Sequence, residues 1–220
     1  MKKIISCILC GILTVGLMGC SLFDNGNPTV QTKIYEASDS ADRYEDYIFV
    51  GDSRFVGMKD ALDGHVDSDV EIIAKVGQGL AWLKKTAPSL YDKTGKTIIF
   101  NLGVNDLYNA SLYVEYYNNM PKSFLENNRV IFMTVNPVNE KKEAEYGYKV
   151  TNKEIEKFNN TLKENLDKNF LMIDTNTYAQ LNDFTTTDGL HYNNKTYIGI
   201  FDHAIECCEK NDFVKRKDRT

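Results

Sequence analysis

Basic runs are missing from this 220-residue sequence. Its 26 Lys and Arg residues stand against 31 Asp and Glu, and the formal net charge is −5. The one basic cluster, Lys215-Arg216-Lys217, lies near the end of the chain between Asp212 and Asp218. Proteins that bind nucleic acid usually gather Lys and Arg in a stripe or patch. The sequence therefore predicts no nucleic-acid partner.

The sequence also lacks an apolar run long enough to span a bilayer. A basic start at residues 1–3 leads into an apolar stretch over residues 4–18. A spanning helix needs about 20 apolar residues, whereas a basic start before a shorter apolar stretch is typical of a secretory signal. We therefore expect a signal peptide over residues 1–19.

The end of this stretch, Leu17-Met18-Gly19-Cys20-Ser21, resembles the lipobox of bacterial lipoproteins, in which the Cys becomes the lipidated first residue of the mature chain. A plain signal peptide, or an N-terminal anchor that is never cut, is the alternative. The polar residues that follow predict a flexible tether over residues 20–45. The remaining residues, 46–220, are enough for one folded domain. We expect this domain to be a monomer, extracytoplasmic and anchored to the bacterial membrane through lipid on Cys20.

Cysteine and histidine are scarce, at five and three residues. Once the signal is removed and Cys20 carries lipid, only Cys207 and Cys208 remain, and a bridge between neighbouring residues is strained. We therefore expect free thiols on a helix and no disulfide framework. Neither cysteine has a metal-ligand spacing to His65, His191 or His203, so no metal site is expected.

Short apolar runs alternate with longer amphipathic stretches from residue 47 onward. The runs are nearly continuous in Ile, Val and Phe, as in strands covered on both faces; they span 47–50, 70–76, 97–102, 130–135 and 170–173. The expected helices span 55–62, 80–90, 111–127, 151–167 and about 194–210. This alternation predicts a three-layer α/β/α fold with a five-stranded parallel sheet and right-handed crossovers.

Small and polar residues follow every one of these runs. Because the carboxyl ends of parallel strands meet at one edge of a sheet, the residues that follow them converge there. In chain order the clusters are Gly51-Asp52-Ser53, Gly77-Gln78-Gly79, Gly103-Val104-Asn105-Asp106, Asn136-Pro137 and Asp188-Gly189-Leu190-His191.

Four of these clusters, taken in order, resemble the four blocks of the SGNH (or GDSL) hydrolases over residues 47 to about 208. One block alone is weak evidence, since an Asp-Gly pair is also an ordinary turn. The resemblance implies a flavodoxin-like three-layer fold and a serine esterase. It implies Ser53 as the nucleophile, His191 as the base and Asp188 as the group that orients the imidazole.

The resemblance also implies donors for the oxyanion: the backbone N–H of Ser53, the N–H of a glycine in the second block, and the Asn105 side chain. Gly79 fits the family spacing slightly better than Gly77 if the helix opens at residue 80, and both stay open. Serine acyl chemistry needs no cofactor, so none is expected.

The sequence departs from the family pattern at Arg54, where the name-giving motif has Leu. A guanidinium beside the nucleophile could contact an anionic substrate or pair with a nearby acid. Trp82 and Pro137 are further candidate substrate contacts, although a lone Trp at helical spacing is more typical of a core. We expect Asp106 to brace its loop and Asp52 to order the nucleophile turn.

Together these features predict an extracytoplasmic serine esterase that removes acetyl or other short acyl groups from carbohydrate. A lysophospholipase, a thioesterase and an O-acyltransferase would use the same triad. The absence of a long hydrophobic lid disfavours a dedicated lipase. An inactive surface binding module is the alternative from another class, which the complete set of triad and oxyanion residues disfavours.

Overall fold

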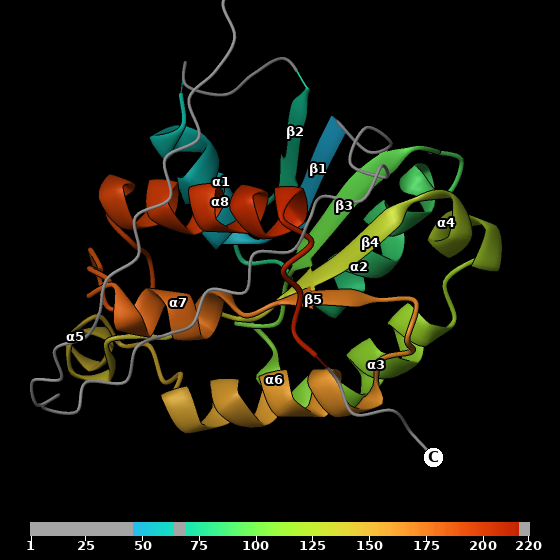
Figure 1. Ribbon diagram of the computed structural model, residues 1–220. Coiled ribbons are helices and arrows are strands. Elements are labelled where there is room, and N and C mark those ends of the chain that lie inside the picture. The colour runs from blue at the N-terminus through green and yellow to red at the C-terminus, as the bar shows by residue number, and fades with distance from the viewer. Residues whose placement is uncertain (1–45, 64–68, 216–220) are drawn as a thin grey trace, which may run out of the picture. The chain divides into compact units, whose positions relative to one another are not determined.

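A computed structural model of the protein describes residues 46–63 and 69–215. The predicted signal peptide, the lipidated Cys20, the tether and His65 lie outside the described residues. Five parallel strands form one sheet in the order β2-β1-β3-β4-β5 (Figure 1). The strands are β1 (Asp46–Gly51), β2 (Val70–Ala74), β3 (Lys96–Asn101), β4 (Arg129–Met133) and β5 (Leu171–Ile173).

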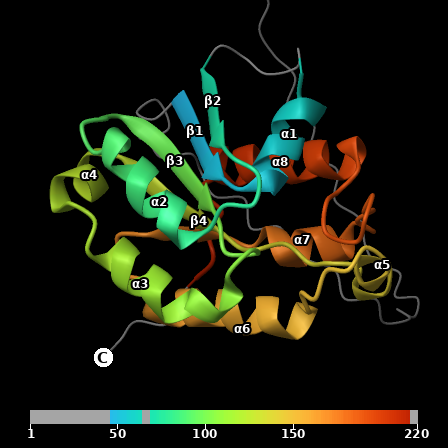
Figure 2. The ribbon, with the colours of Figure 1, turned by 180° about the vertical axis from the view of Figure 1, so that it is seen from behind.

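Helices cover both faces of this sheet, and the predicted three-layer α/β/α fold is confirmed. One face carries α1 (Ser53–Ala61), α7 (Thr175–Leu181) and α8 (Asn194–Glu209), which lie in front of the sheet in Figure 1. The other face carries α2 (Leu80–Thr86), α3 (Ala110–Asn118), α4 (Lys122–Asn127) and α6 (Asn152–Asn165), with α2 and α3 in front of the sheet in Figure 2.

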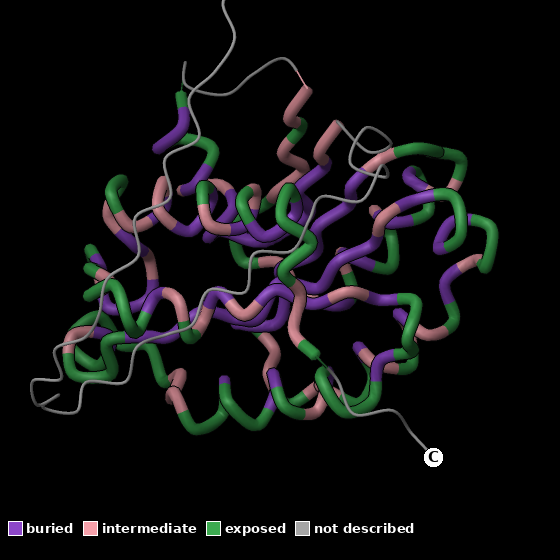
Figure 3. The backbone as a smooth tube through the Cα atoms, viewed as in Figure 1, coloured by how far each residue is buried: buried purple, intermediate pink, exposed green. Residues whose placement is uncertain are grey.

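Alternate residues of each strand supply two separate cores. In β1, Phe49 packs with the α1 and α8 side, whereas Ile48 and Val50 pack with the α2 and α3 side. All three are buried. In Figure 3 the central strands β1, β3 and β4 are largely buried, whereas the edge strand β2 is mostly intermediate. Burial on both faces explains why the central strands are nearly continuous in apolar residues.

The helices differ from the prediction mainly at prolines and in short segments. Pro121 separates α3 from α4, because proline lacks an N–H and disfavours the helical conformation of the residue before it. The stretch 80–90 ends as a 3₁₀ segment, η2 (Ala87–Leu90), with Pro88 in its first turn. The sequence reading missed η3 (Leu107–Asn109), α5 (Glu140–Glu145) and α7, which are too short for a helical period to stand out.

The two neighbouring cysteines are free and buried on α8, as expected. Burial raises the pKa of the Cys207 thiol to about 11 and that of Cys208 to about 12, so neither carries thiolate at neutral pH. Across residues 46–63 and 69–215, no helix combines the length and apolar character needed to cross a bilayer.

Candidate active site

Ser53 stands at the turn between β1 and α1. Asp52 caps the helix, and its Oδ1 accepts a hydrogen bond from the Arg54 N–H at 3.0 Å. A side chain at Gly51 would place its Cβ 2.4 Å from Phe55, so glycine lets the strand pass close to the helix. The first N–H groups of a helix have no intrahelical partner, and the backbone N–H of Ser53 is one of them.

The Ser53 hydroxyl begins a chain of hydrogen bonds that ends at a carboxylate. His191 Nε2 lies 2.9 Å from Ser53 Oγ, and His191 Nδ1 lies 2.7 Å from Asp188 Oδ2. The serine and the histidine are 138 positions apart in sequence. Ser53 is 7% exposed, and the His191 and Asp188 side chains are partly exposed. The sheet edge therefore brings the three residues together as the sequence predicted.

Asp188 is held in its ionised form by the loop that carries it. Partial burial on its own would raise the pKa of this carboxyl. The opposing effect prevails, because Oδ1 accepts from the backbone N–H groups of Leu190 at 2.9 Å and His191 at 2.7 Å while Oδ2 faces the His191 ring. These bonds hold the pKa of Asp188 below its ordinary value. The ionised carboxylate favours the tautomer in which Nδ1 carries the proton and Nε2 accepts one from serine.

The two loops that carry the candidate oxyanion donors are bonded to each other. Asn105 is exposed, and its Nδ2 donates to the Gln78 carbonyl at 2.8 Å. Asp106 accepts from the Leu80 N–H at 2.9 Å and from the Tyr113 hydroxyl at 2.8 Å. Asp106 thus braces its loop, as predicted.

Glycine is favoured at Gly77 and at Gly79 for different structural reasons. A Cβ at Gly79 would lie 2.5 Å from the Asp106 carboxyl, so only glycine allows that contact. Gly77 has open space around it and a φ of +70°, which favours glycine for conformational reasons. Both reasons are structural and leave the choice between the two as oxyanion donor open.

Arg54 is buried, and its guanidinium is surrounded by backbone carbonyl groups. It is 2% exposed, and its guanidinium donates to the carbonyls of Asn136 at 2.7 Å, Leu190 at 3.2 Å and Pro137 at 3.4 Å. It also lies 5.2 Å from the ring centroid of Tyr192 and forms no ion pair with the acids of the described residues. The Arg54 guanidinium is therefore engaged by backbone carbonyl groups, and it joins the nucleophile helix to the loop of Asp188 and His191.

Pro137 and Trp82, the other two candidate substrate contacts, both pack within the fold. Pro137 is buried, and its carbonyl accepts from Arg54 and from the Tyr192 hydroxyl, so it braces this part of the fold; contact with substrate stays a prediction. Trp82 is partly buried against the core on the α2 side of the sheet, which is the alternative stated for it. His203 stacks on Tyr178 with 4.0 Å between ring centroids, in the α7 and α8 layer.

Asp52 has a carboxylate oxygen with no partner. The residue is 1% exposed, and its Oδ2 makes no hydrogen bond. Burial raises the pKa of Asp52 to about 6, against the opposing influence of the Arg54 N–H and charge. Asp52 orders the nucleophile turn as expected, but it does so as a carboxyl that is costly to ionise.

This raised pKa predicts a pH-dependent loss of stability. The folded protein holds the Asp52 proton up to about pH 6, whereas the ordinary pKa is 3.8, so the free energy of unfolding falls as the pH rises through that window. At about 1.4 kcal/mol per pKa unit, the loss is roughly 3 kcal/mol. The variant Asp52→Asn keeps an acceptor for Arg54 and cannot ionise.

Urea unfolding of both proteins at pH 4.5 and pH 7.5 measures this effect. The stability of the wild type relative to the variant should fall with rising pH. The depressed pKa of Asp188 acts in the opposite direction, but it is present in both proteins and cancels in the difference. Equal differences at the two pH values would contradict the raised pKa.

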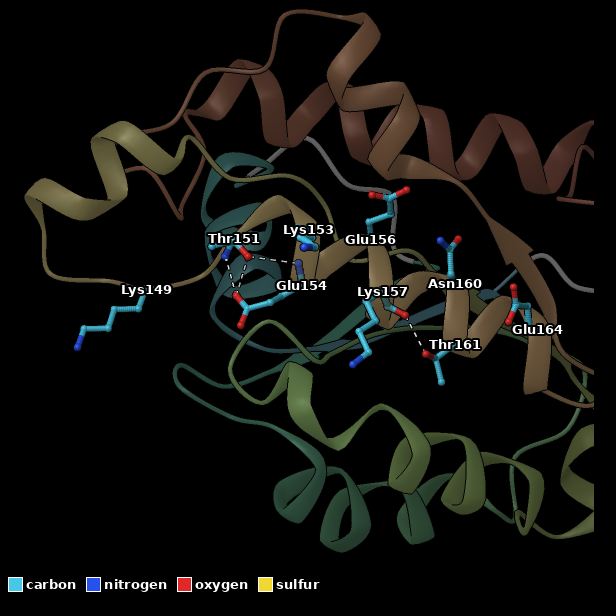
Figure 4. A pocket seen from close by; sticks show the side chains of 9 residues that line it. All are labelled: Lys149, Thr151, Lys153, Glu154, Glu156, Lys157, Asn160, Thr161 and Glu164. Carbon is cyan, nitrogen blue, oxygen red and sulfur yellow. Dashed lines mark hydrogen bonds between the residues drawn. The ribbon is translucent and has the colours of Figure 1, made fainter.

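Two surface depressions lie outside the triad. Nine side chains of α6 and the segment before it line a depression, and Figure 4 shows them as a mixed acidic and basic helix face. A second depression lies beside α7 and includes Thr134, Asp174 and Gln180. Neither contains Ser53, Asp188 or His191. Within the described residues no group of three or more acidic, His or Cys side chains could hold a metal ion.

Comparison with known proteins yields structural neighbours only. No family model and no curated protein matches the chain. The C-terminal catalytic domain of Streptococcus pneumoniae peptidoglycan O-acetyltransferase A superposes with a TM-score of 0.59 at 17% identity, over 80% of this chain and 99% of that one. A protein of Slackia heliotrinireducens described as an SGNH hydrolase has a TM-score of 0.56 at 14% identity, over 74% and 98%. A lipolytic G-D-S-L family member of Veillonella parvula has a TM-score of 0.51 at 15% identity, over 73% and 96%. The chain therefore has the fold of the SGNH (GDSL) hydrolases, as the four sequence blocks predicted.

Proposed function

We propose that this protein is a serine ester hydrolase in which Ser53, His191 and Asp188 form the catalytic triad. The observation that carries the proposal is the unbroken hydrogen-bond chain from Ser53 Oγ through both His191 nitrogens to Asp188 Oδ2. A serine hydroxyl is a weak nucleophile at neutral pH unless a base accepts its proton. This chain of hydrogen bonds offers His191 as the base, and the Asp188 carboxylate stabilises the imidazolium that forms.

The reaction follows from these contacts. Ser53 Oγ attacks the ester carbonyl carbon while His191 Nε2 takes the hydroxyl proton. The tetrahedral intermediate then collapses, the C–O bond to the alcohol breaks, and His191 returns the proton to the leaving oxygen. Water repeats the sequence on the acyl-enzyme and releases the carboxylic acid. The enzyme ends in its starting protonation state.

Stabilisation of the oxyanion is assigned to donors at the same edge of the sheet. The Ser53 N–H lies at the start of α1, where the helix dipole also favours negative charge. We assign the second donor to the N–H of Gly79 or Gly77 and the third to the Asn105 side chain. The bond from Asn105 to Gln78 supports this, because it occupies one N–H of the amide and keeps the side chain beside the second block.

The proposed substrate is a carbohydrate that carries acetyl or other short acyl esters, outside the cytoplasmic membrane. The lipobox-like sequence at Cys20 supports the location, and membrane fractionation of the wild type and Cys20→Ala would test it. One structural neighbour is named for O-acetyl transfer to peptidoglycan, which makes a cell-wall glycan a reasonable first substrate to test.

Covalent labelling tests the proposed chemistry directly. A fluorophosphonate probe should modify the wild type at Ser53 and fail to modify Ser53→Ala, because only an activated serine attacks the probe. Ser89→Ala is the matched control, since this exposed hydroxyl donates to the Thr86 carbonyl and should not affect labelling. Peptide mass mapping locates the adduct. An unlabelled wild type, or an adduct elsewhere, would remove the triad assignment and favour the binding-module alternative.

Product analysis then separates the enzymatic alternatives. The wild type and Ser53→Ala are each incubated with acetylated xylan, acetylated peptidoglycan and a lysophospholipid. Free acetate from a glycan would support the proposal. An acylated acceptor would indicate transfer, and fatty acid release would indicate a lysophospholipase. The same triad would act in all three reactions, so the products identify the substrate and the acyl acceptor.

A further inference from the structure

The segment that follows β4 packs directly on the loop of Asp188 and His191. The Asn139 N–H donates to the Gly189 carbonyl at 2.9 Å, and Lys142 Nζ donates to the Thr186 carbonyl at 2.8 Å. A Cβ at Gly189 would lie 2.1 Å from the Glu143 nitrogen, so α5 touches the backbone of the loop. The loop of the proposed triad is therefore built against α5, a helix that the sequence reading missed.

Residues 146–150 then form a strap that leads from α5 to α6. Figure 4 shows this stretch where it carries Lys149 toward the start of α6. The Tyr146 and Tyr148 N–H groups both donate to the Glu143 carbonyl, at 3.0 and 3.2 Å. The Glu143 carboxylate, 1% exposed, accepts from the Val150 N–H. The backbone of the strap is thus held to Glu143 at both ends.

Tyr148 reaches from this strap to the proposed triad. Its hydroxyl donates to Asp188 Oδ2 at 3.4 Å, and its ring stands edge-on to the His191 ring with 6.3 Å between centroids. The other donors to the Asp188 carboxylate are the Leu190 and His191 N–H groups and the His191 ring. Among the described residues, Tyr148 is the one donor to this carboxylate that comes from outside the Asp-x-x-His loop.

We propose that Tyr148 is a positioning residue, which holds the Asp188 carboxylate toward His191 and moderates the basicity of the imidazole. The inference rests on the proposed function. The hydroxyl shares the oxygen that faces His191 Nδ1, so it draws off part of the negative charge there. Without it, Oδ2 would keep more of its negative charge and would bind Nδ1–H more strongly. The carboxylate would also be free to rotate, and the reactive geometry would be occupied less often.

Other charged and titratable groups face Asp188 and His191, and all of them are retained when Tyr148 is changed. Asp52 and Arg54 approach from the β1–α1 turn and Tyr197 from α8. Lys142 and Glu143 approach from α5. A difference between the wild type and a variant at Tyr148 therefore reports the loss of that side chain.

The test compares Tyr148→Phe with the wild type in the pH dependence of kcat/KM for p-nitrophenyl acetate. Activity rises with pH as the catalytic base is deprotonated, and a more negative Oδ2 favours the protonated base, so the acidic limb of the profile should move to higher pH. We expect a shift of about half a pH unit and a fall in kcat of roughly 3- to 10-fold with little change in KM. Tyr146→Phe is the matched control, because Tyr146 is a 59% exposed tyrosine of the same strap whose hydroxyl touches no triad member.

Two further measurements distinguish a positioning role for Tyr148 from a role as part of the wall of the pocket. If Tyr148 only forms a wall, Tyr148→Phe will match the wild type in pH profile and kcat, while Tyr148→Ala will raise KM; that result would overturn the inference. The NMR chemical shift of the His191 Nδ1 proton reports the bond to Asp188 without turnover, and an unchanged shift in Tyr148→Phe would also overturn it. Fluorophosphonate labelling of the wild type separately reports whether the proposed function holds.

Discussion

Replacing His191 with alanine is expected to lower kcat/KM for p-nitrophenyl acetate by at least about 10⁴-fold, because the Ser53 hydroxyl then has no base to take its proton. His191 Nε2 is the group within hydrogen-bond distance of Ser53 Oγ, at 2.9 Å. The members of a triad act as one unit, so their effects are not additive. Ser53→Ala and the double variant should therefore fall to about the same residual rate as His191→Ala.

His203→Phe is the matched control for this experiment. It removes an imidazole from the α7 and α8 layer while keeping a ring that can stack on Tyr178. Steady-state kinetics with purified proteins of equal folded fraction should show near wild-type activity for this control. Residual activity of His191→Ala above about one-hundredth of the wild type would contradict the assigned base.

Arg54→Met is expected to lower the free energy of unfolding by about 4 kcal/mol, because it leaves buried carbonyl groups without donors. The guanidinium satisfies the carbonyls of Asn136, Leu190 and Pro137 in a site where Arg54 is 2% exposed. Leu190 lies between Asp188 and His191, so the loop should also lose its fixed position and activity should fall. Arg54→Lys should be intermediate, since an ammonium group lacks the planar fork that reaches three acceptors.

Urea unfolding at pH 7.5 measures this loss, and Lys59→Met is the control. Lys59 is an exposed cation on the same helix, and its removal should change stability by no more than about 0.5 kcal/mol. If Arg54→Met were as stable as this control, the buried guanidinium would not be the tie between α1 and the loop. Retained activity in a destabilised Arg54→Met would show that the loop keeps its position by other contacts.

Much of the fold could be predicted because strand signals are local. A strand buried on both faces, such as β1, β3 or β4, is nearly continuous in apolar residues, and all five runs are distinct from the amphipathic stretches between them. The helix boundaries were less predictable. Pro121 ends α3 where the pattern continued, and α5, with six residues, shows less than two helical turns of periodicity.

The candidate triad could be predicted for a related reason. Parallel strands bring their carboxyl ends to one edge, so a motif after the first strand and one after the last lie close in space. The sequence could not predict the environment of Arg54. A guanidinium beside a serine can face solvent, an acid or carbonyl groups, and the choice depends on loops at Asn136 and Leu190 that are far away in the chain.

The chemistry that is available can be read from the amino-acid order alone: four ordered blocks contain Ser53, Asn105, Asp188 and His191, and they follow strands of a parallel sheet. The surroundings of these groups depend on the folded chain. It buried Arg54 and Pro137, left Asp52 Oδ2 without a partner, and brought Tyr148 to Asp188. The reason is that local periodicity specifies strands and turns, whereas burial and side-chain partners depend on contacts between segments that only folding brings together.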